Sequence, residues 1–234
     1  MTRFVKVLMA AALAACAATA QDSGEPRLTG VMLFIKGGGE VGYIILLVSV
    51  IGLALAIESG MTITRKKLAP PEVVDQLRAH IENKDFQAAF DLCEQNPCYI
   101  TNVMHAALPK LEHGFEKMEE AAGSVAEEEA VRLHSKISWM GLIGTVAPLL
   151  GLFGTVQGMI IAFETIELMA APKPAELAFG IKVALITTFQ GLMVAIPVTI
   201  AFFYFRNKVV GIVLEMSAMI EDLLEPFRPA PGHS

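Results

Sequence analysis

Charged residues are scarce in this chain of 234 residues, because Asp, Glu, Lys and Arg together make up only 18% of it. An average soluble domain carries about 25% charged residues. Basic residues are outnumbered as well, since 18 Lys and Arg stand against 24 Asp and Glu, which disfavours a nucleic-acid-binding protein. The three cysteines are too few for a disulfide framework. With 54% hydrophobic residues, the composition indicates a small polytopic membrane protein.

The N-terminus has the features of a secretory signal peptide over residues 1–20. Arg3 and Lys6 precede an apolar run at 7–18 that is too short to span a bilayer, and an A-x-A-like cleavage site ends at Ala20. Alternatively, the residues ending at Cys16 (LAAC) resemble a lipobox with Cys16 as the lipidated residue. We favour ordinary cleavage, because a protein with several spans needs no lipid anchor.

Three long apolar runs follow, at residues 41–57, 137–163 and 183–205, and none of them contains a charged residue. A spanning helix needs roughly 20 apolar residues. The sequence therefore predicts three transmembrane helices, which we place at residues 33–60, 137–163 and 179–205.

Basic residues predict the orientation of these spans. Arg65, Lys66 and Lys67 follow the first span, whereas the loop between the second and third spans contains only Lys173. Lys and Arg concentrate on the cytoplasmic side. The predicted cytoplasmic parts are residues 61–136 and the helix and tail at 206–234. The predicted periplasmic parts are the N-terminal segment 21–32 and the loop 164–178, in a multi-pass protein of a bacterial inner membrane.

The parts outside the spans are predicted to be helical too. No proline occurs between residues 115 and 147, which predicts one long helix from about residue 115 through the second span. Apolar residues near the C-terminus alternate steps of four and three, which is the spacing of a helical packing stripe. They are Val209, Val213, Met216, Ile220, Leu223 and Phe227. We expect an all-α membrane protein with long cytoplasmic helical extensions, assembled into an oligomeric helical bundle.

Residues that could support catalysis or bind a metal do not form a recognisable site. Cys93 and Cys98 lack the spacing of a zinc ribbon. The histidines outside the spans have no nucleophile or carboxylate at a recognisable spacing, and the glycines at 37–39 do not follow a strand. The sequence predicts a protein that is not an enzyme and that has no metal or cofactor.

Small and polar residues form stripes at helical spacing in the second and third spans. Close helix packing explains such stripes, because small residues let helices approach each other in lipid. The stripes could also line a central cavity, where the hydroxyls of Thr155 and Thr188 would help to solvate an ion or a guest carboxyl group. The second-span stripe consists of Gly144, Pro148, Gly151, Thr155, Gly158 and Ala162, and Gly191 and Pro197 belong to the third span.

Neither of these two spans contains Asp, Glu or His. A proton relay through hydrocarbon normally needs a titratable group within it. If this chain conducts protons, a partner must supply the carboxylate.

Two motifs resemble a known family. Residues 147–156 (APLLGLFGTV) resemble the second-span signature of the MotA/TolQ/ExbB proton-channel family, and residues 191–197 (GLMVAIP), with Thr187 and Thr188 before them, resemble its third-span signature. Their order, their separation and the three-span layout are similar to those of the ExbB/TolQ branch.

The resemblance implies a homopentamer around a dimer of an ExbD/TolR-like protein, which has one membrane helix bearing an aspartate. Thr155 and Thr188 match the family's pore threonines, and the complex acts on a TonB- or TolA-like transducer. One position departs from the family pattern: Val183 stands where a glutamate is common. A passive scaffold for a partner protein and a sodium-driven stator subunit remain alternatives, and the transported cargo is open.

Overall fold

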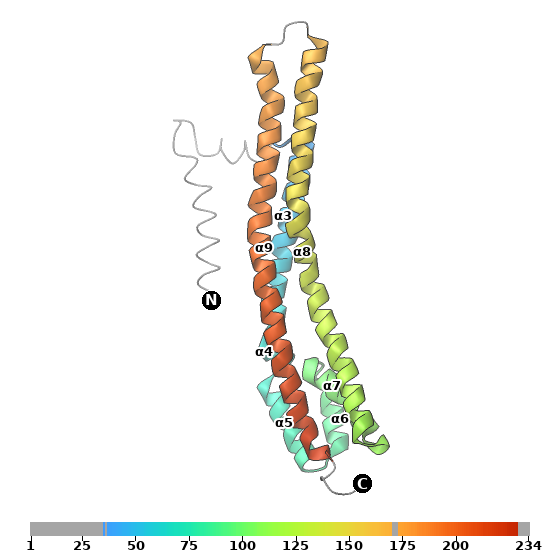
Figure 1. Cartoon of the computed structure of the whole chain (residues 1–234). Helices are drawn as coiled ribbons and strands as arrows, with labels where there is room; N and C mark the ends of the chain where they lie inside the picture. Colours follow the sequence, from blue (N-terminus) through green and yellow to red (C-terminus); the bar gives the residue numbers. More distant parts are fainter. Residues whose placement is uncertain (1–34, 36, 170–172, 229–234) are drawn as a thin grey trace. The chain divides into compact units, whose positions relative to one another are not determined.

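Helices make up the regular secondary structure of the described part of the chain, which comprises residues 35, 37–169 and 173–228 of a computed structural model (Figure 1). No strand occurs in these residues, so the predicted all-α fold is confirmed. The predicted signal peptide at residues 1–20, including Cys16, and the predicted segment 21–32 lie outside the described residues.

Three long helices carry the predicted membrane spans: α3 (Gly39–Thr62), α8 (Phe115–Leu168) and α9 (Pro174–Leu224). The spans predicted at 137–163 and 179–205 lie within α8 and α9, whereas α3 begins six residues after the predicted start of the span at 33–60. Each is long and apolar enough to cross a membrane. The 24 residues of α3 extend about 36 Å, slightly more than the roughly 30 Å of bilayer hydrocarbon. The 54 residues of α8 extend about 81 Å. The structure therefore confirms the long helix predicted from about residue 115.

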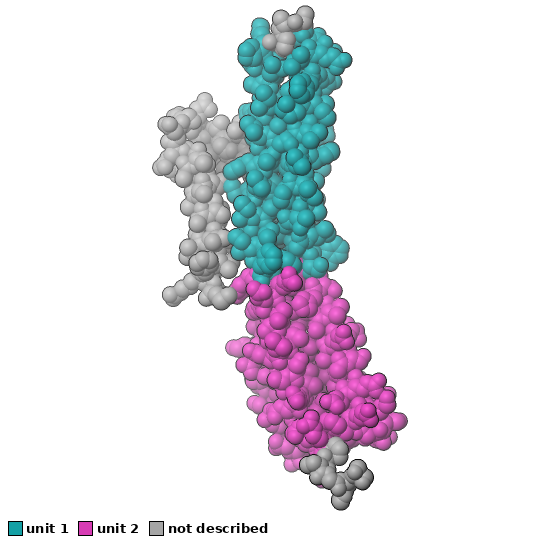
Figure 2. Space-filling view, in the orientation of Figure 1, with its two compact units in different colours: residues 1–57, 138–203 teal, residues 58–137, 204–234 magenta. Residues whose placement is uncertain are grey.

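Unit 1 comprises residues 1–57 and 138–203, and its described part is built mainly from segments of α3, α8 and α9 (Figure 2). Large apolar side chains face outward, since Leu47, Phe153 and Leu185 are 64%, 62% and 66% exposed. Small and polar residues such as Ala147 and Thr187 are fully buried. Soluble proteins rarely expose so much apolar surface. The arrangement suits helices that contact lipid outside and pack closely inside.

Unit 2 comprises residues 58–137 and 204–234 (Figure 2). It has a core of large apolar side chains, and Leu77, Ile100 and Met118 are fully buried. Its short elements pack with the remaining parts of α8 and α9. They are α4 (Arg65–Leu68), α5 (Pro71–Glu82), α6 (Phe86–Gln95), α7 (Tyr99–Ala107), η1 (Leu108–His113) and η2 (Glu225–Phe227).

The C-terminal half of α9 buries the apolar stripe read from the sequence. Its buried members are Val209, Met216, Ile220 and Leu223. The structure adds contacts with the short helices: Arg78 of α5 pairs with Asp222, and the rings of Phe86 and Phe227 lie 5.4 Å apart.

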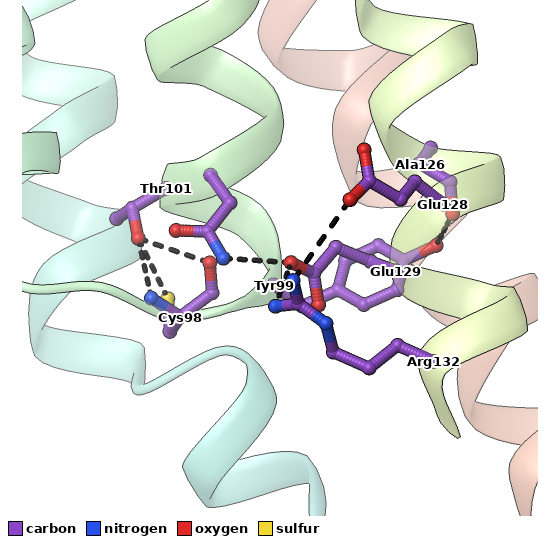
Figure 3. A network of polar contacts seen from close by, with 8 residues as sticks. Cys98, Tyr99, Thr101, Ala126, Glu128, Glu129 and Arg132 are labelled. Carbon is purple, nitrogen blue, oxygen red and sulfur yellow. Dashed lines mark hydrogen bonds and ion pairs between the residues drawn. The ribbon is translucent and has the colours of Figure 1, made fainter. Parts of the chain in front are cut away.

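A polar network fastens α7 to α8 within unit 2 (Figure 3). The Tyr99 hydroxyl donates to the carbonyl oxygen of Ala126 at 2.8 Å, and burial raises the pKa of Tyr99. Asn102 donates to Oε1 of Glu129 at 2.9 Å, and Arg132 donates to the same oxygen at 3.0 Å. The network joins segments 27 residues apart in sequence, so it holds the start of α7 against α8.

Candidate functional site

Glycines bring the backbones of α8 and α9 into direct contact in unit 1. A Cβ built on Gly158 would lie 2.6 Å from the carbonyl oxygen of Gly180, and one on Gly191 would lie 2.6 Å from that of Ala147. Real Cβ atoms essentially never come within 3.0 Å of another heavy atom in this way. Only glycine fits these positions without a shift of backbone. We call the set Gly144, Gly151, Gly158, Gly180 and Gly191 the glycine seam.

The Gly144 end of the glycine seam differs from the rest in what it contacts. Gly144 faces a side chain, because its Cβ would lie 2.6 Å from Oγ1 of Thr199. Gly151 faces backbone, because its Cβ would lie 3.1 Å from both the Thr187 carbonyl oxygen and the Thr188 Cα. Pro148 and Pro197 lie inside α8 and α9, and both helices continue through them.

Thr155 and Thr188, the two candidate pore residues, lie at the edges of this seam. Both are half-buried. Thr155 donates its hydroxyl to the carbonyl oxygen of Leu152 at 2.6 Å, and Thr188 donates to that of Ala184 at 3.2 Å. Gly151, one helical turn before Thr155, contacts Thr188, so the two threonines occupy neighbouring levels of the seam. Each hydroxyl can rotate its proton away from this carbonyl and donate it to a carboxylate instead.

Thr187 and Gln190 are buried polar residues to which the sequence analysis assigned no role. Both are fully buried in unit 1. Thr187 donates to the carbonyl oxygens of Val183 and Ala184 at 3.1 and 2.9 Å. A Cβ on Gly154 would overlap the Thr187 side chain. The missing side chain of Gly154 therefore provides the space for this threonine.

Gln190 fills space left by two glycines at the start of α3. A Cβ on Gly42 would lie 2.9 Å from Oε1 of Gln190, and one on Gly38 would overlap the same atom. The sequence analysis treated Gly38 only as part of a run of glycines. The small-x-x-x-small spacing of residues 38 and 42 was the available signal, because it is typical of close helix approach in membranes.

Titratable groups are placed at the ends of the spans. Glu40 lies in the first turn of α3, and Glu58 pairs with Lys136 at 3.6 Å. Val183 is buried and aliphatic. No group of three potential metal ligands occurs among the residues that the structure describes. The described spans can thus offer hydroxyls and an amide to a guest ion, but no carboxylate from their interior.

The two cysteines of unit 2, Cys93 and Cys98, are free thiols. Burial, followed by the neighbouring Cys98, raises the pKa of Cys93 to about 12. The thiolate is the reactive form, and at pH 8 a pKa this high leaves it about a thousandfold less populated than in an ordinary cysteine. We expect iodoacetamide to alkylate Cys93 at least about a hundredfold more slowly in the folded protein than in urea. Mass spectrometry of the peptides measures both rates, and equal rates would contradict the burial of this thiol.

Comparisons with known proteins match the chain to one family profile and to relatives that are named biopolymer transport proteins. The profile of the MotA/TolQ/ExbB proton channel family matches residues 93–218. A putative biopolymer transport protein ExbB-like 1 of Synechocystis is 34% identical over 174 residues, covering 72% of this chain and 67% of the relative. Biopolymer transport protein exbB1 of Vibrio cholerae is 40% identical over 88 residues, covering 36% and 39%. A putative ExbB homolog of Methanothermobacter thermautotrophicus is 27% identical over 180 residues, covering 76% and 64%.

Proposed function

Because this chain belongs to the MotA/TolQ/ExbB proton channel family, we propose that it is the multi-span subunit of a proton-driven motor. In this proposal it surrounds an ExbD/TolR-like partner with one membrane helix and one membrane aspartate. The complex converts proton motive force into mechanical work on a TonB- or TolA-like transducer for transport at the outer membrane.

One observation supports this assignment most strongly. Thr155 and Thr188 are half-buried hydroxyls on neighbouring levels of α8 and α9, in spans that contain no acidic residue or histidine between residues 137 and 163 or between 183 and 205. A charged carboxylate at the centre of a bilayer costs about 2.5–3.5 kcal/mol on insertion scales. Hydroxyls aimed at a partner's aspartate lower that cost and favour its ionised form on one side.

The driving force is large enough to alternate the aspartate between two states. One proton crossing 100 mV releases about 2.3 kcal/mol, which is comparable to the cost of burying the charge. The aspartate is protonated where its surroundings are dry and ionised beside the threonine hydroxyls. This alternation couples proton flow to a rearrangement of the partner within the bundle.

The proposal also includes the location, the orientation and the stoichiometry of the complex. The protein lies in a bacterial inner membrane, with its N-terminus in the periplasm and its C-terminus in the cytoplasm. Five copies surround two partner helices, so that the glycine seam of each copy stays packed and the threonine edge faces the axis. Unit 2 then forms the cytoplasmic part of the assembly.

Co-purification with the product of a neighbouring reading frame tests this proposal. We expect a single-span protein with a membrane aspartate to bind this chain and to allow proton flux in liposomes, measured with a pH-sensitive dye. The control is the Asp→Asn partner, which should still bind but conduct no protons. Flux that persists with this variant would refute the borrowed carboxylate. Flux that follows a sodium gradient would favour a sodium-driven stator, and binding without any flux a passive scaffold.

A further inference from the structure

Unit 2 carries a group of basic side chains that packing within the chain does not explain. It consists of Lys66 and Lys67 on α4 and Arg206 and Lys208 on α9, which we call the basic belt. Lys66, Lys67 and Arg206 are exposed, and Lys208 is half-buried. The belt begins where the apolar parts of α3 and α9 end, because α3 ends at Thr62 and α9 has an uncharged run up to Phe205.

The two halves of the basic belt lie on segments of unit 2 that contact each other. A Cβ on Gly60, near the end of α3, would lie 3.6 Å from Cζ of Phe205 in α9. Farther along, Nε of Arg65 lies 3.6 Å from Oε2 of Glu215. The first contact lies one residue before Arg206, and the second joins the residue before Lys66 to a residue of α9 that follows Lys208. The segments that contain the two halves of the belt are therefore in contact within unit 2.

Buried residues on either side of α4 hold its cations outward. Ile63 and Ala69 are 0% and 3% exposed, whereas none of the four residues of α4 is buried. The backbone N–H of Ala69 donates to the carbonyl oxygen of Arg65 at 2.8 Å and closes the short helix. The fold therefore fixes the position of the two lysines without using their side chains for packing.

Nearby acidic residues do not neutralise the belt. Glu58 pairs with Lys136, and Glu215 pairs with Arg65. Among the described residues, the belt cations form no ion pair within 4.0 Å. Lys208 lies 6.0 Å from the centre of the Phe205 ring, which is at the outer limit of a cation–π contact. Four positive charges thus remain available to an external anion.

The exposed side chains next to the belt indicate what kind of anion fits. In unit 2, Met61 of α3 is 63% exposed, and along the sequence of α9 an uncharged run ends at Phe205, immediately before Arg206. Along each segment, apolar residues give way to cations within a few positions. A phospholipid has a matching order of groups, because its apolar acyl chains are followed by a negatively charged phosphate. A second copy of this chain would bring its own belt of equal charge, which repels.

We propose that the basic belt binds the headgroups of anionic phospholipids, of the phosphatidylglycerol class. Each Lys or Arg near an anionic membrane surface strengthens binding by about fivefold. The bound lipid screens the four charges and anchors α4 at the bilayer surface. The proposal is independent of the ion path, because none of the belt residues belongs to the glycine seam or its threonine edge.

Lipid binding to the purified full-length oligomer in detergent tests the belt without depending on the orientation of insertion. Native mass spectrometry measures the affinities of added phosphatidylglycerol and phosphatidylcholine. We expect a preference for phosphatidylglycerol that K66Q/K67Q weakens by roughly 25-fold, from two fivefold effects. R206Q/K208Q should weaken it similarly, and K66R/K67R should retain it.

The matched control is K84Q/K110Q, which removes two exposed lysines from unit 2 outside the belt. It should change the affinity by less than twofold. The proposal is overturned if both belt variants bind phosphatidylglycerol like the unmodified protein, or if phosphatidylcholine binds equally well. A change of oligomer mass in K66Q/K67Q with unchanged lipid affinity would also overturn it, because the belt would then contact another copy.

Discussion

Adding one methyl group at Gly158 or Gly191 is expected to destabilise unit 1 by at least about 2 kcal/mol, toward the upper end of overpacking costs. The Cβ of Gly158→Ala would lie 2.6 Å from the carbonyl oxygen of Gly180, and that of Gly191→Ala 2.6 Å from that of Ala147. Backbone atoms cannot move aside by changing rotamer, so the helices must separate. Thermal unfolding in detergent, followed by far-ultraviolet circular dichroism, measures the loss.

Identical substitutions elsewhere on the same two helices provide the control. Gly123 lies in α8 and Gly211 in α9, and a Cβ on either meets nothing within 4 Å. Alanine is the better helix former by about 0.8–1.0 kcal/mol, so Gly123→Ala and Gly211→Ala should leave stability unchanged or raise it. Equal effects at all four positions would mean that the glycine seam contributes nothing to packing.

The helices themselves could be predicted from the sequence because their cause is local. Uncharged apolar runs of this length have few alternatives to a spanning helix. The proline-free segment after Phe115 correctly predicted that α8 continues beyond its span. The buried stripe of α9 was visible for the same reason, since residues such as Val209 and Met216 recur at helical spacing.

The pairing of individual positions could not be predicted, because it depends on how the helices dock. The stripe read from the second span includes Gly151 and Thr155, whereas the observed contact also includes Ala147 and Gly154. This rotation moves Thr155 from the middle of the contact to its edge. In the third span, Thr187 rather than Thr188 is the threonine that packs fully inside.

The burial of Gln190 could not be predicted from the sequence for a related reason. An amide in an apolar helix can face lipid, a cavity or another helix, and only the partner decides. Here the partner is the start of α3, where Gly42 and the preceding Gly38 leave room for the side chain. A polar residue and a small-x-x-x-small pair lie about 150 positions apart, and one chain without its fold does not connect them.

Valine at Thr188 and valine at Thr187 should affect proton flux differently, although the residues are adjacent. Thr188→Val, alone or with Thr155→Val, is expected to reduce proton flux through the complete complex more than tenfold and to leave assembly intact. The half-buried hydroxyl is lost from the edge where the proposed partner aspartate lies, while the side-chain volume is kept. Flux in liposomes and co-purification of the partner measure the two effects separately.

Thr187→Val is the matched control, because it removes a hydroxyl that is fully buried and bonded to the carbonyl oxygens of Val183 and Ala184. Those carbonyls belong to the helix itself, so losing the extra hydrogen bonds should cost only about 0.5–1.5 kcal/mol of stability and leave flux unchanged. If Thr187→Val abolishes flux and Thr188→Val does not, the ion pathway follows the buried polar residues and not the seam edge. The half-buried position of Thr188 would then be a matter of packing alone, and the partner's aspartate would have to be sought near Gln190.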